Sequence, residues 1–268
     1  MKPDEIIIAV DAGNTNIKFA VYSNNEIIQT WTMSVCRERS PAEYFSILQS
    51  LSAAAGIDIS AVAGVIVSSV VPYINPAITM LFKNFFGITP LFITGTSAGL
   101  FGINVRLAQH AIGTDRLADL VAARTIWPSR NLLVIGMGTV TVFNLLTKDG
   151  DLYGQVLAPG LTCIAQSMRT CTALLPEVCV CNDDMDTVVR NSTESAVQSG
   201  VYWGYKSMIS GIVEQINLEE QDKSLYVVAT GGGSNVLRDC NAIDHIDPSL
   251  TLRGILQIYL QLKKGPHH

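Results

Sequence analysis

Apolar and polar positions in the first 35 residues predict three short strands. Residues 6–10 form a run of β-branched side chains, which is typical of a buried strand. Residues 17–22 and 26–31 are predicted as two further strands, and the pair Asn24-Asn25 between them is a turn signal. Because these connections are short, we expect an antiparallel meander.

Helical and strand patterns then alternate along the chain. Helical spacing of apolar residues predicts a helix over residues 41–55, with Ser40 as its N-cap. A strand over 62–71, a helix over 76–86 and a strand over 90–93 follow. This alternation predicts α/β architecture.

The opening pattern returns in the second half of the chain. Strands are predicted over 131–135, 140–146 and 152–157, after a helix over 114–127. The corner Gly136–Thr139 matches the corner Asp11–Asn14 in its layout. We therefore expect an internal duplication with two similar lobes, residues 1–117 and 118–268.

Three further elements complete the prediction. Residues 192–216 have a helical pattern, either as one long helix or as two helices broken near Gly200 and Gly204. Residues 225–230 are predicted as a strand that runs into three consecutive glycines, and residues 249–262 as a closing helix.

Composition excludes several classes of partner. The 268 residues are 48% hydrophobic and 15% charged, and the formal net charge is −5. The basic residues do not cluster into a stripe, so we expect no nucleic-acid partner. No apolar run approaches the length of a membrane span, and the acidic N-terminus is unlike a secretion signal. We expect a cytoplasmic protein that does not bind membranes.

Six cysteines are few for a disulfide scaffold of this length. Cys179 and Cys181 could form half of a metal site, but no His or Cys pair at finger spacing accompanies them. We expect reduced structural thiols.

The first corner has the composition of a phosphate site. A tight turn at Gly13 presents backbone N–H groups on one side, and such groups bind phosphate. Asn14 and Thr15 add donors, and Lys18 adds a positive charge. Asp11 can hold Mg²⁺ directly or through water, because Mg²⁺ takes few carboxylates together with phosphate oxygens.

A second set of small residues supports the same chemistry. Gly138 and Thr139 form the second corner, while Gly231 and Gly232 would let the backbone approach a nucleoside. A plain β-hairpin explains either corner alone. The repeat together with the glycine triplet favours nucleotide binding, with a polyphosphate held from both lobes.

Phosphoryl transfer also needs a group that takes the proton of the acceptor hydroxyl. Asp115 is the best candidate, because it opens a helix whose dipole favours a charged carboxylate. Arg116 could hold an acidic substrate through two hydrogen bonds. An acidic residue in a first helical turn is equally well explained by ordinary helix chemistry.

These pieces together resemble the type III pantothenate kinase family, within the superfamily of acetate and sugar kinases, heat-shock chaperones and actin. The resemblance covers nearly the whole chain. Its motifs, in order, are VDAGNTNIKFA from Val10, SSVVP from Ser68, GTDRLADLVAA from Gly113, GMGTVTVFN from Gly136, LAPG from Leu157, NST from Asn191 with QSG from Gln198, and ATGG from Ala229.

The resemblance implies a fold and an activity. The fold would be two duplicated ribonuclease-H-like lobes of the actin-like type, each a mixed five-stranded sheet with flanking helices. The enzyme would be a homodimer that uses ATP and Mg²⁺ to phosphorylate pantothenate, the first step of coenzyme A synthesis. Asp115 would be the general base, with Gly113, Arg116 and Thr193 holding pantothenate, and a monovalent cation, K⁺ or NH₄⁺, would be required.

The chain departs from the family pattern inside the site. Gly136 and Asn144 stand where the family's second phosphate motif has aspartates, and Val140 stands where it has alanine. Gly136 offers no side chain to the monovalent cation. Asp119 also stands where asparagine is common.

Three hypotheses remain open on the sequence. The first is an active pantothenate kinase whose monovalent-ion requirement is altered or absent. The second is a non-catalytic or regulatory paralogue that kept the fold and the ligand pocket. The third is a kinase or phosphatase of the same superfamily that acts on another small acid, for which residues 102–112 are where a changed acceptor would show.

Overall fold

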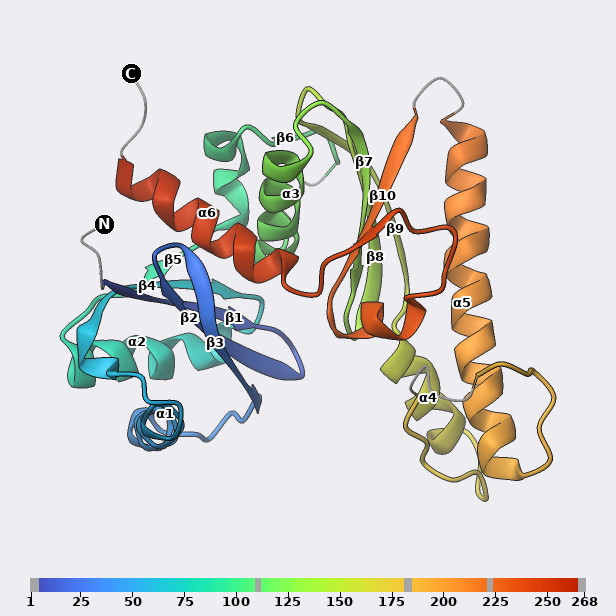
Figure 1. The fold of residues 1–268 in the computed structure, drawn as a ribbon, viewed down its shortest axis with the longest axis horizontal. Coiled ribbons are helices and arrows are strands. Elements are labelled where there is room, and N and C mark those ends of the chain that lie inside the picture. Colours follow the sequence, from blue (N-terminus) through green and yellow to red (C-terminus); the bar gives the residue numbers. More distant parts are fainter. Residues whose placement is uncertain (1–4, 109–111, 181–184, 221–223, 265–268) are drawn as a thin grey trace. The chain divides into compact units, whose positions relative to one another are not determined.

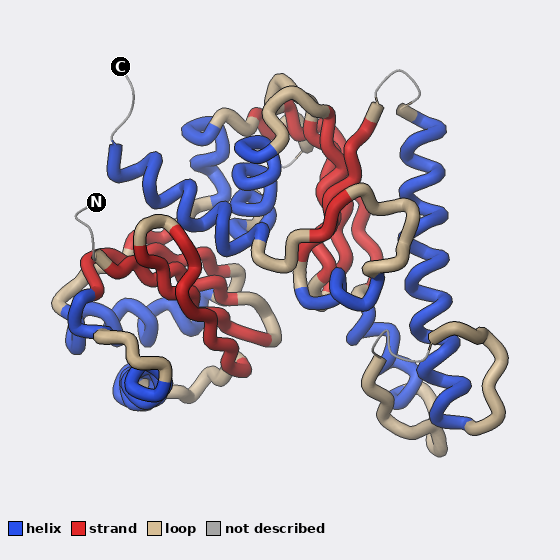
Figure 2. The backbone as a smooth tube through the Cα atoms, in the orientation of Figure 1, coloured by secondary structure: helices blue, strands red, loops and turns tan. Residues whose placement is uncertain are grey.

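A computed structural model describes residues 5–108, 112–180, 185–220 and 224–264 of the chain. The chain separates into two compact units. The first comprises the described residues of 1–103, 109–122 and 251–268, and the second those of 104–108 and 123–250. Each unit contains one mixed sheet with flanking helices, as Figures 1 and 2 show, so the predicted α/β class is confirmed.

The sheet of the first unit has five strands in the order β3-β2-β1-β4-β5. Strands β1, β2 and β3 form the predicted antiparallel meander, and β4 pairs in parallel with β1. Asn24 and Asn25 both have positive φ and make the turn between β2 and β3. The strand bounds are β1 Ile6–Ala12, β2 Asn16–Ser23, β3 Glu26–Ser34, β4 Val62–Ser69 and β5 Leu91–Phe92.

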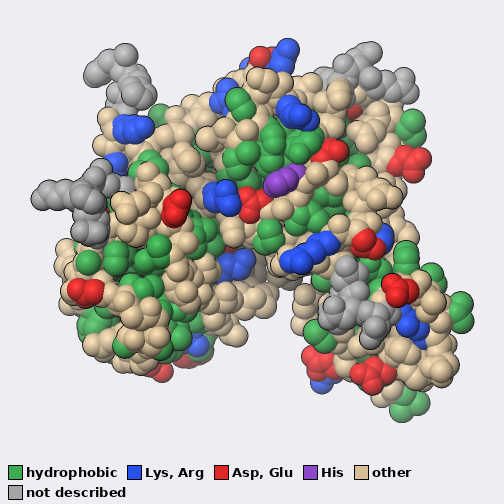
Figure 3. All heavy atoms as spheres, in the orientation of Figure 1, with side chains coloured by type: hydrophobic (Ala, Val, Ile, Leu, Met, Phe, Trp, Pro, Cys, Tyr) green, Lys and Arg blue, Asp and Glu red, His purple; other side chains and the backbone are tan. Residues whose placement is uncertain are grey.

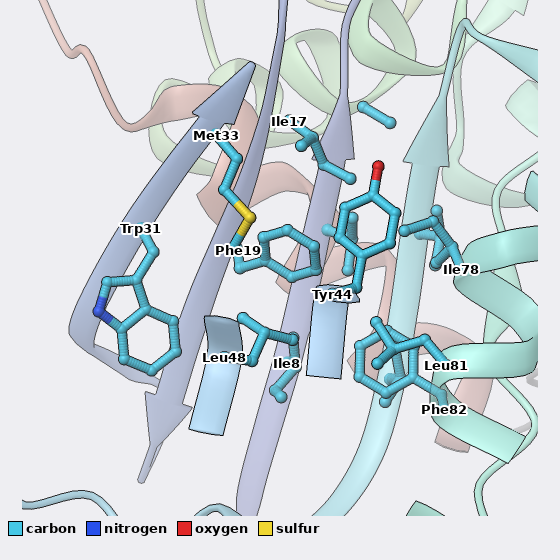
Figure 4. Packing of buried hydrophobic residues seen from close by; sticks show 14 of the residues in the cluster. Ile8, Ile17, Phe19, Trp31, Met33, Tyr44, Leu48, Ile78, Leu81 and Phe82 are labelled. Carbon is cyan, nitrogen blue, oxygen red and sulfur yellow. The ribbon is translucent and has the colours of Figure 1, made fainter. Parts of the chain in front are cut away.

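Helices α1 (Pro41–Ala54) and α2 (Asn75–Phe86) cover one face of this sheet. Ser40 caps α1 through a reciprocal pair of hydrogen bonds with Glu43, which confirms the predicted N-cap. The core between the sheet and these helices is built from large buried side chains, several of which Figure 4 labels: Ile8, Ile17, Phe19, Trp31, Met33, Tyr44, Leu48, Ile78, Leu81 and Phe82.

The sheet of the second unit repeats the first in the order β11-β10-β7-β8-β9-β6. Here β7, β8 and β9 form the antiparallel meander, and β10 pairs in parallel with β7. This repeat of topology confirms the predicted duplication. The strand bounds are β6 Asn104–Val105, β7 Asn131–Met137, β8 Val140–Leu146, β9 Asp151–Pro159, β10 Leu225–Thr230 and β11 His245–Ile246.

The prediction of five strands in each sheet is wrong for the second unit, where β6 adds a sixth strand. β6 has two residues and pairs in parallel with the start of β9. The side chains of Asn104 and Arg106 both donate to Oδ1 of Asp151, at 3.0 and 3.2 Å. A two-residue strand has no periodicity, so its sequence could not indicate it.

The helices of the second unit differ from the prediction in two ways. Residues 193–219 form one unbroken helix, α5 (Thr193–Glu219), so neither Gly200 nor Gly204 breaks it. Helix α4 (Leu161–Thr170) was not predicted, because only Leu161 of its residues is buried and its N-cap, Gly160, makes no side-chain bond. In Figure 1, α5 runs alongside the second sheet, against which it packs its buried residues.

The first unit also contains α3 (Thr114–Ile126) as far as Ala122 and α6 (Leu250–Lys264) from Thr251 onward. The predicted lobe boundary at residues 117 and 118 falls inside α3, which is unbroken. In the structure, the first unit extends along α3 to Ala122 and also includes α6 from Thr251 onward. Helix α6 joins the first unit through packing between residues far apart in the sequence, which no local sequence pattern indicates.

Two glycines let α6 pack closely within the first unit. A Cβ atom at Gly64 of β4 would lie 1.9 Å from the hydroxyl oxygen of Tyr259, and one at Gly254 would lie 1.9 Å from the backbone oxygen of Ala118. Helix α6 is therefore in direct contact with both β4 and α3.

Two features of the surface bear on partners. In the part of the chain that the structure describes, no helix is both long enough and apolar enough to cross a membrane. On the face drawn in Figure 3, lysine and arginine side chains are scattered and interspersed with acidic ones.

Candidate active site

Asp11 lies at the end of β1, on the face of the first sheet away from α1 and α2. Its neighbours Val10 and Ala12 belong to the core beneath those helices. Because side chains alternate along a strand, Asp11 points to the opposite face. Ser68 of β4 is its partner in the parallel ladder and points the same way.

The first corner is shaped by its own backbone. The N–H of Gly13 donates to the carbonyl of Asn16 at 3.0 Å, and the N–H of Val35 donates to the carbonyl of Thr15 at 2.9 Å. Asn14 and Thr15 are exposed at the tip. The corner is thus a fixed turn whose polar side chains face solvent, as a phosphate site requires.

A buried hydrogen bond joins this sheet to the start of α3. Ser68 Oγ donates to Thr114 Oγ1 at 2.9 Å, and both residues are buried. Since Ser68 is paired with Asp11 in the sheet, the bond brings Asp115, the next residue of α3, to the end of β1 that carries Asp11.

The Asp115 carboxylate has a defined position. Its Oδ1 accepts a hydrogen bond from the Arg116 N–H at 2.8 Å. A Cβ atom at Gly113 would lie only 2.5 Å from the same oxygen. A side chain at position 113 would therefore require the Asp115 carboxylate to move.

Charges in this part of the first unit influence one another. Burial raises the pKa of Asp11 to about 6; the charge of Lys18 opposes this shift, and that of Asp115 adds to it. Burial lowers the pKa of Arg116, which the negative charges of Asp115 and Asp119 counteract. Asp11, Lys18, Asp115 and Arg116, which the sequence singled out separately, therefore lie within electrostatic reach of each other.

The acidic residues are not arranged as a ready-made metal cage. Among the described residues, no group of three or more His, Cys, Asp or Glu side chains could hold a metal ion together. Mg²⁺ usually keeps several waters and takes one or two carboxylates plus substrate phosphates. The half-buried Asp11 fits that mode of binding.

The second corner and the glycine turn lie together in the second unit. The N–H of Gly138 donates to the carbonyl of Val140 at 3.2 Å, and that of Gly160 donates to the carbonyl of Thr139 at 3.0 Å. Gly231 has φ +92°, and a Cβ there would lie 2.6 Å from the carbonyl oxygen of Met137. The turn at Gly231, which continues into Gly232, is thus seated on the second corner.

Gly136 occupies the same place in the second sheet that Asp11 occupies in the first. It pairs with Thr230 of β10 and with Val142 of β8, as Asp11 pairs with Ser68 and Lys18. The Thr230 hydroxyl is buried and has no hydrogen-bond partner among the described residues. Neither Gly136 nor its ladder partners Thr230 and Val142 carries a carboxylate that could bind a monovalent cation.

Thr193 is the first residue of α5 and is exposed. Ser192 caps this helix by accepting a hydrogen bond from the N–H of Ser195 at 3.2 Å. Thr193 belongs to the second unit, whereas Gly113, Asp115 and Arg116 belong to the first.

Sequence reasoning missed two polar pairs. Ser68 lies in a motif that the sequence displayed, although nothing local showed that it bonds Thr114. Thr251 donates to Oδ1 of Asp119 at 2.7 Å across 132 residues of chain, and no sequence signal could have found that pair.

Two solved structures resemble this chain in fold. A solved structure of a candidate 2-dehydro-3-deoxygalactonokinase from Sinorhizobium meliloti matches with a TM-score of 0.57, at 12% identity over 98% of each chain. A candidate Baf-family transcriptional activator from Campylobacter jejuni matches with a TM-score of 0.53, at 17% identity over 96% of this chain and 99% of the other. At these low identities, the two matches show that the fold is shared.

Sequence comparison then identifies the family. A model described as type III pantothenate kinase matches residues 7–215. The type III pantothenate kinase of Anaplasma phagocytophilum is 53% identical over 96% of this chain and 97% of its own length. That of Ehrlichia canis is 44% identical over 97% and 98%, and that of Caulobacter vibrioides 35% identical over 95% and 97%. The chain belongs to the type III pantothenate kinase family.

Proposed function

We propose that this chain transfers the γ-phosphoryl group of ATP to the primary hydroxyl of pantothenate, which begins coenzyme A synthesis. The observation that carries the proposal is the position of Asp115, which the Ser68–Thr114 bond brings to the end of the strand that carries Asp11. Family membership supplies the substrates.

The chemistry of the site follows from its residues. The Asp115 carboxylate accepts the proton of the hydroxyl, the hydroxyl oxygen bonds to the γ-phosphorus, and the bond to the bridging oxygen breaks to release ADP. Mg²⁺ on Asp11 would offset the charge on the phosphoryl oxygens. In the first unit, Lys18 and the first corner would bind phosphate. In the second unit, Gly138 and Thr139 form a corner of the same kind, which could also bind phosphate. Arg116 would hold the carboxylate of pantothenate.

Substitution of the base tests this proposal. Asp115→Asn keeps the shape of the side chain but removes its ability to accept a proton. We expect turnover to fall by about 10²-fold or more, while ATP affinity stays close to that of the unchanged protein. Equal losses of turnover and of ATP affinity would contradict the role of Asp115 as the base.

The proposed enzyme does not depend on a monovalent cation in the way its family does. Gly136 has no side chain, and its neighbour Thr230 offers only a hydroxyl. A site without a carboxylate attracts K⁺ or NH₄⁺ weakly. We therefore expect activity in Na⁺ salts close to that in K⁺ salts.

The proposed assembly is a homodimer, for which α5 offers a surface. Five small residues follow one another along its exposed side at spacings of three or four: Ala196, Gly200, Gly204, Ser207 and Gly211. A Cβ atom added at any of the three glycines would meet nothing within 4 Å. Small residues let a second helix approach closely, and here that helix would come from a second copy of the chain.

One observation favours a second candidate function. Gly136 and Asn144 together remove two carboxylates from the motif that the family uses beside ATP. Charge stabilisation dominates phosphoryl transfer, so this loss is what a non-catalytic paralogue would show. Such a protein would bind ATP or pantothenate without turning them over.

A further inference from the structure

Asp119 lies one helical turn beyond Asp115 on α3 and is 5% exposed. Residues four apart on a helix share a face, so both carboxyl groups belong to the same side of α3. Oδ1 of Asp119 accepts a hydrogen bond of 2.7 Å from the hydroxyl of Thr251, at the start of α6. A buried carboxyl group beneath a proposed catalytic base, bonded to a different helix, has no part in the mechanism described above.

The bond between Asp119 and Thr251 belongs to a tightly packed joint between α3 and α6. Gly254 of α6 packs so closely against the backbone of Ala118, the residue before Asp119, that no side chain fits at position 254. Further along α6, Tyr259 lies over Gly64 in the same sheet that carries Asp11. Helix α6 therefore touches α3, which carries Asp115, and β4, the strand that pairs with the Asp11 strand β1.

We propose that Asp119 is a positioning residue for phosphoryl transfer, which locks α3 against α6 through Thr251 and so fixes Asp115 relative to Asp11. This inference rests on the proposed function, because it concerns the geometry of the same reaction. Displacement of a reacting group by about 1 Å can lower a rate by about 10²-fold.

The surroundings of Asp119 favour its protonated form over its ionised form. Burial raises the pKa of Asp119 well above its ordinary value of 3.8, and the negative charges of Asp115 and Asp11 raise it further. The hydrogen bond from Thr251 and the positive charge of Lys18 act in the opposite direction. A third ionised carboxylate at this place would also repel the phosphates of ATP. Arg116 is the other charged group that interacts with it.

The sign of the stability effect follows from that shift. The folded protein binds the Asp119 proton more tightly than the unfolded chain does. The contribution of this proton to the free energy of unfolding is complete below the pKa of the unfolded chain, near 3.8. That contribution is lost as the pH rises through the raised pKa of the folded protein. Replacement by asparagine removes this dependence, because an amide carries no proton to lose.

Two substitutions at position 119 separate positioning from mere packing. Asp119→Asn keeps the acceptor for Thr251 without a charge, and we expect kcat for pantothenate within about twofold of the unchanged protein. Asp119→Ala loses the bond, and we expect kcat to fall by about tenfold or more with KM for ATP within about twofold. Gly254→Ala, which pushes the two helices apart, should lower kcat in the same way.

The controls address folding and pH. Ser52→Ala removes a buried hydroxyl elsewhere in the first unit, where Ser52 Oγ donates to the carbonyl of Leu48 at 2.6 Å, and should lower the melting temperature without changing kcat. Thr251→Ser keeps the donor and should behave as the unchanged protein. For Asp119→Asn, the gain in melting temperature over the unchanged protein should grow as the pH rises above 4.

The outcomes are distinct. Turnover by the unchanged protein together with unchanged kcat in Asp119→Ala would overturn the positioning role and leave the proposed function intact. An equal loss of kcat in Asp119→Asn and Asp119→Ala would show that an ionised carboxylate is needed, which contradicts the inference. Absence of turnover in the unchanged protein would overturn the proposed function itself, and the positioning role with it.

Discussion

Ser68 and Thr114, 46 residues apart in the sequence, are joined by a buried hydrogen bond of 2.9 Å. One end of this bond lies beside Asp11 in the sheet, and the other end lies in the first turn of α3, next to Asp115. The bond therefore ties the strand beside the proposed metal ligand to the helical turn that carries the proposed base. Mutation of either hydroxyl should affect chemistry more than ligand binding.

For Ser68→Ala, we expect a stability loss of about 1 kcal/mol, because the Thr114 hydroxyl loses its buried donor. We also expect kcat to fall by about tenfold with little change in KM for ATP. Steady-state kinetics and thermal unfolding measure both. Ser46→Ala, at an exposed hydroxyl of α1, is the matched control and should change neither quantity. An unchanged kcat in folded Ser68→Ala would show that the bond does not position Asp115.

The raised pKa of Asp11, about 6, predicts how Mg²⁺-dependent nucleotide binding responds to pH. Mg²⁺ needs the ionised carboxylate, so binding should be strong at pH 7 to 8 and weaken by about tenfold per pH unit below 6. Calorimetric titration with Mg²⁺ and a non-hydrolysable ATP analogue between pH 5 and 8 measures this. Asp11→Asn should bind weakly with a flat pH profile, and Glu26→Gln, at the exposed start of β3, should keep the original profile. A flat profile in the unchanged protein would rule out Asp11 as the titrating ligand.

Gly136→Asp should introduce a response to K⁺. The new carboxylate would lie at the partly exposed end of β7, beside the buried Thr230 hydroxyl. We expect the ratio of turnover in K⁺ to that in Na⁺ to rise from near one to about threefold or more, because a fixed negative charge attracts a cation there. Gly136→Ala adds a side chain without charge and should leave the ratio unchanged. If the ratio in Gly136→Asp equals that in Gly136→Ala, Gly136 does not occupy an ion-binding position.

Gly204→Leu should convert a dimer to a monomer. The position is exposed on α5 with open space around it, so a leucine fits the isolated subunit and favours the helix. Across a close helix contact, the same leucine would prevent approach of the partner. Light scattering after size-exclusion chromatography gives the mass, and Ser46→Leu on the exposed side of α1 controls for added apolar surface. A Gly204→Leu protein that keeps the dimer mass would exclude this face of α5 as the interface.

The sequence predicted those elements of the fold that have strong periodicity. Long apolar patterns mark the two meanders and the strands β4 and β10, which pair with them in parallel. Similar patterns mark helices α1, α2, α3, α5 and α6. Strand β6 and helix α4 do not, because the first has two residues and the second buries only Leu161. Tertiary contacts between residues far apart in the chain decide where two-residue strands and exposed helices form. A short stretch of sequence does not contain those contacts.

In the candidate site, too, some features could be predicted from local sequence and others could not. Asp11 and Asp115 could be predicted because each stands at the end of a recognisable element, where backbone geometry presents a side chain. The joint between Asp119 and Thr251 could not, because it unites residues 132 positions apart and depends on how closely α6 approaches α3. Local pattern thus indicates candidate catalytic groups, while long-range packing decides what holds those groups in place.

The most direct test of the central claim is ATP-dependent phosphorylation of pantothenate by the purified protein with Mg²⁺, measured in K⁺, NH₄⁺ and Na⁺ salts, with Asp115→Asn alongside. We predict turnover in all three salts, little stimulation by K⁺ or NH₄⁺, and loss of turnover in Asp115→Asn. A folded protein that binds ATP or pantothenate but transfers no phosphoryl group in any salt would contradict the account and establish a non-catalytic member of the family.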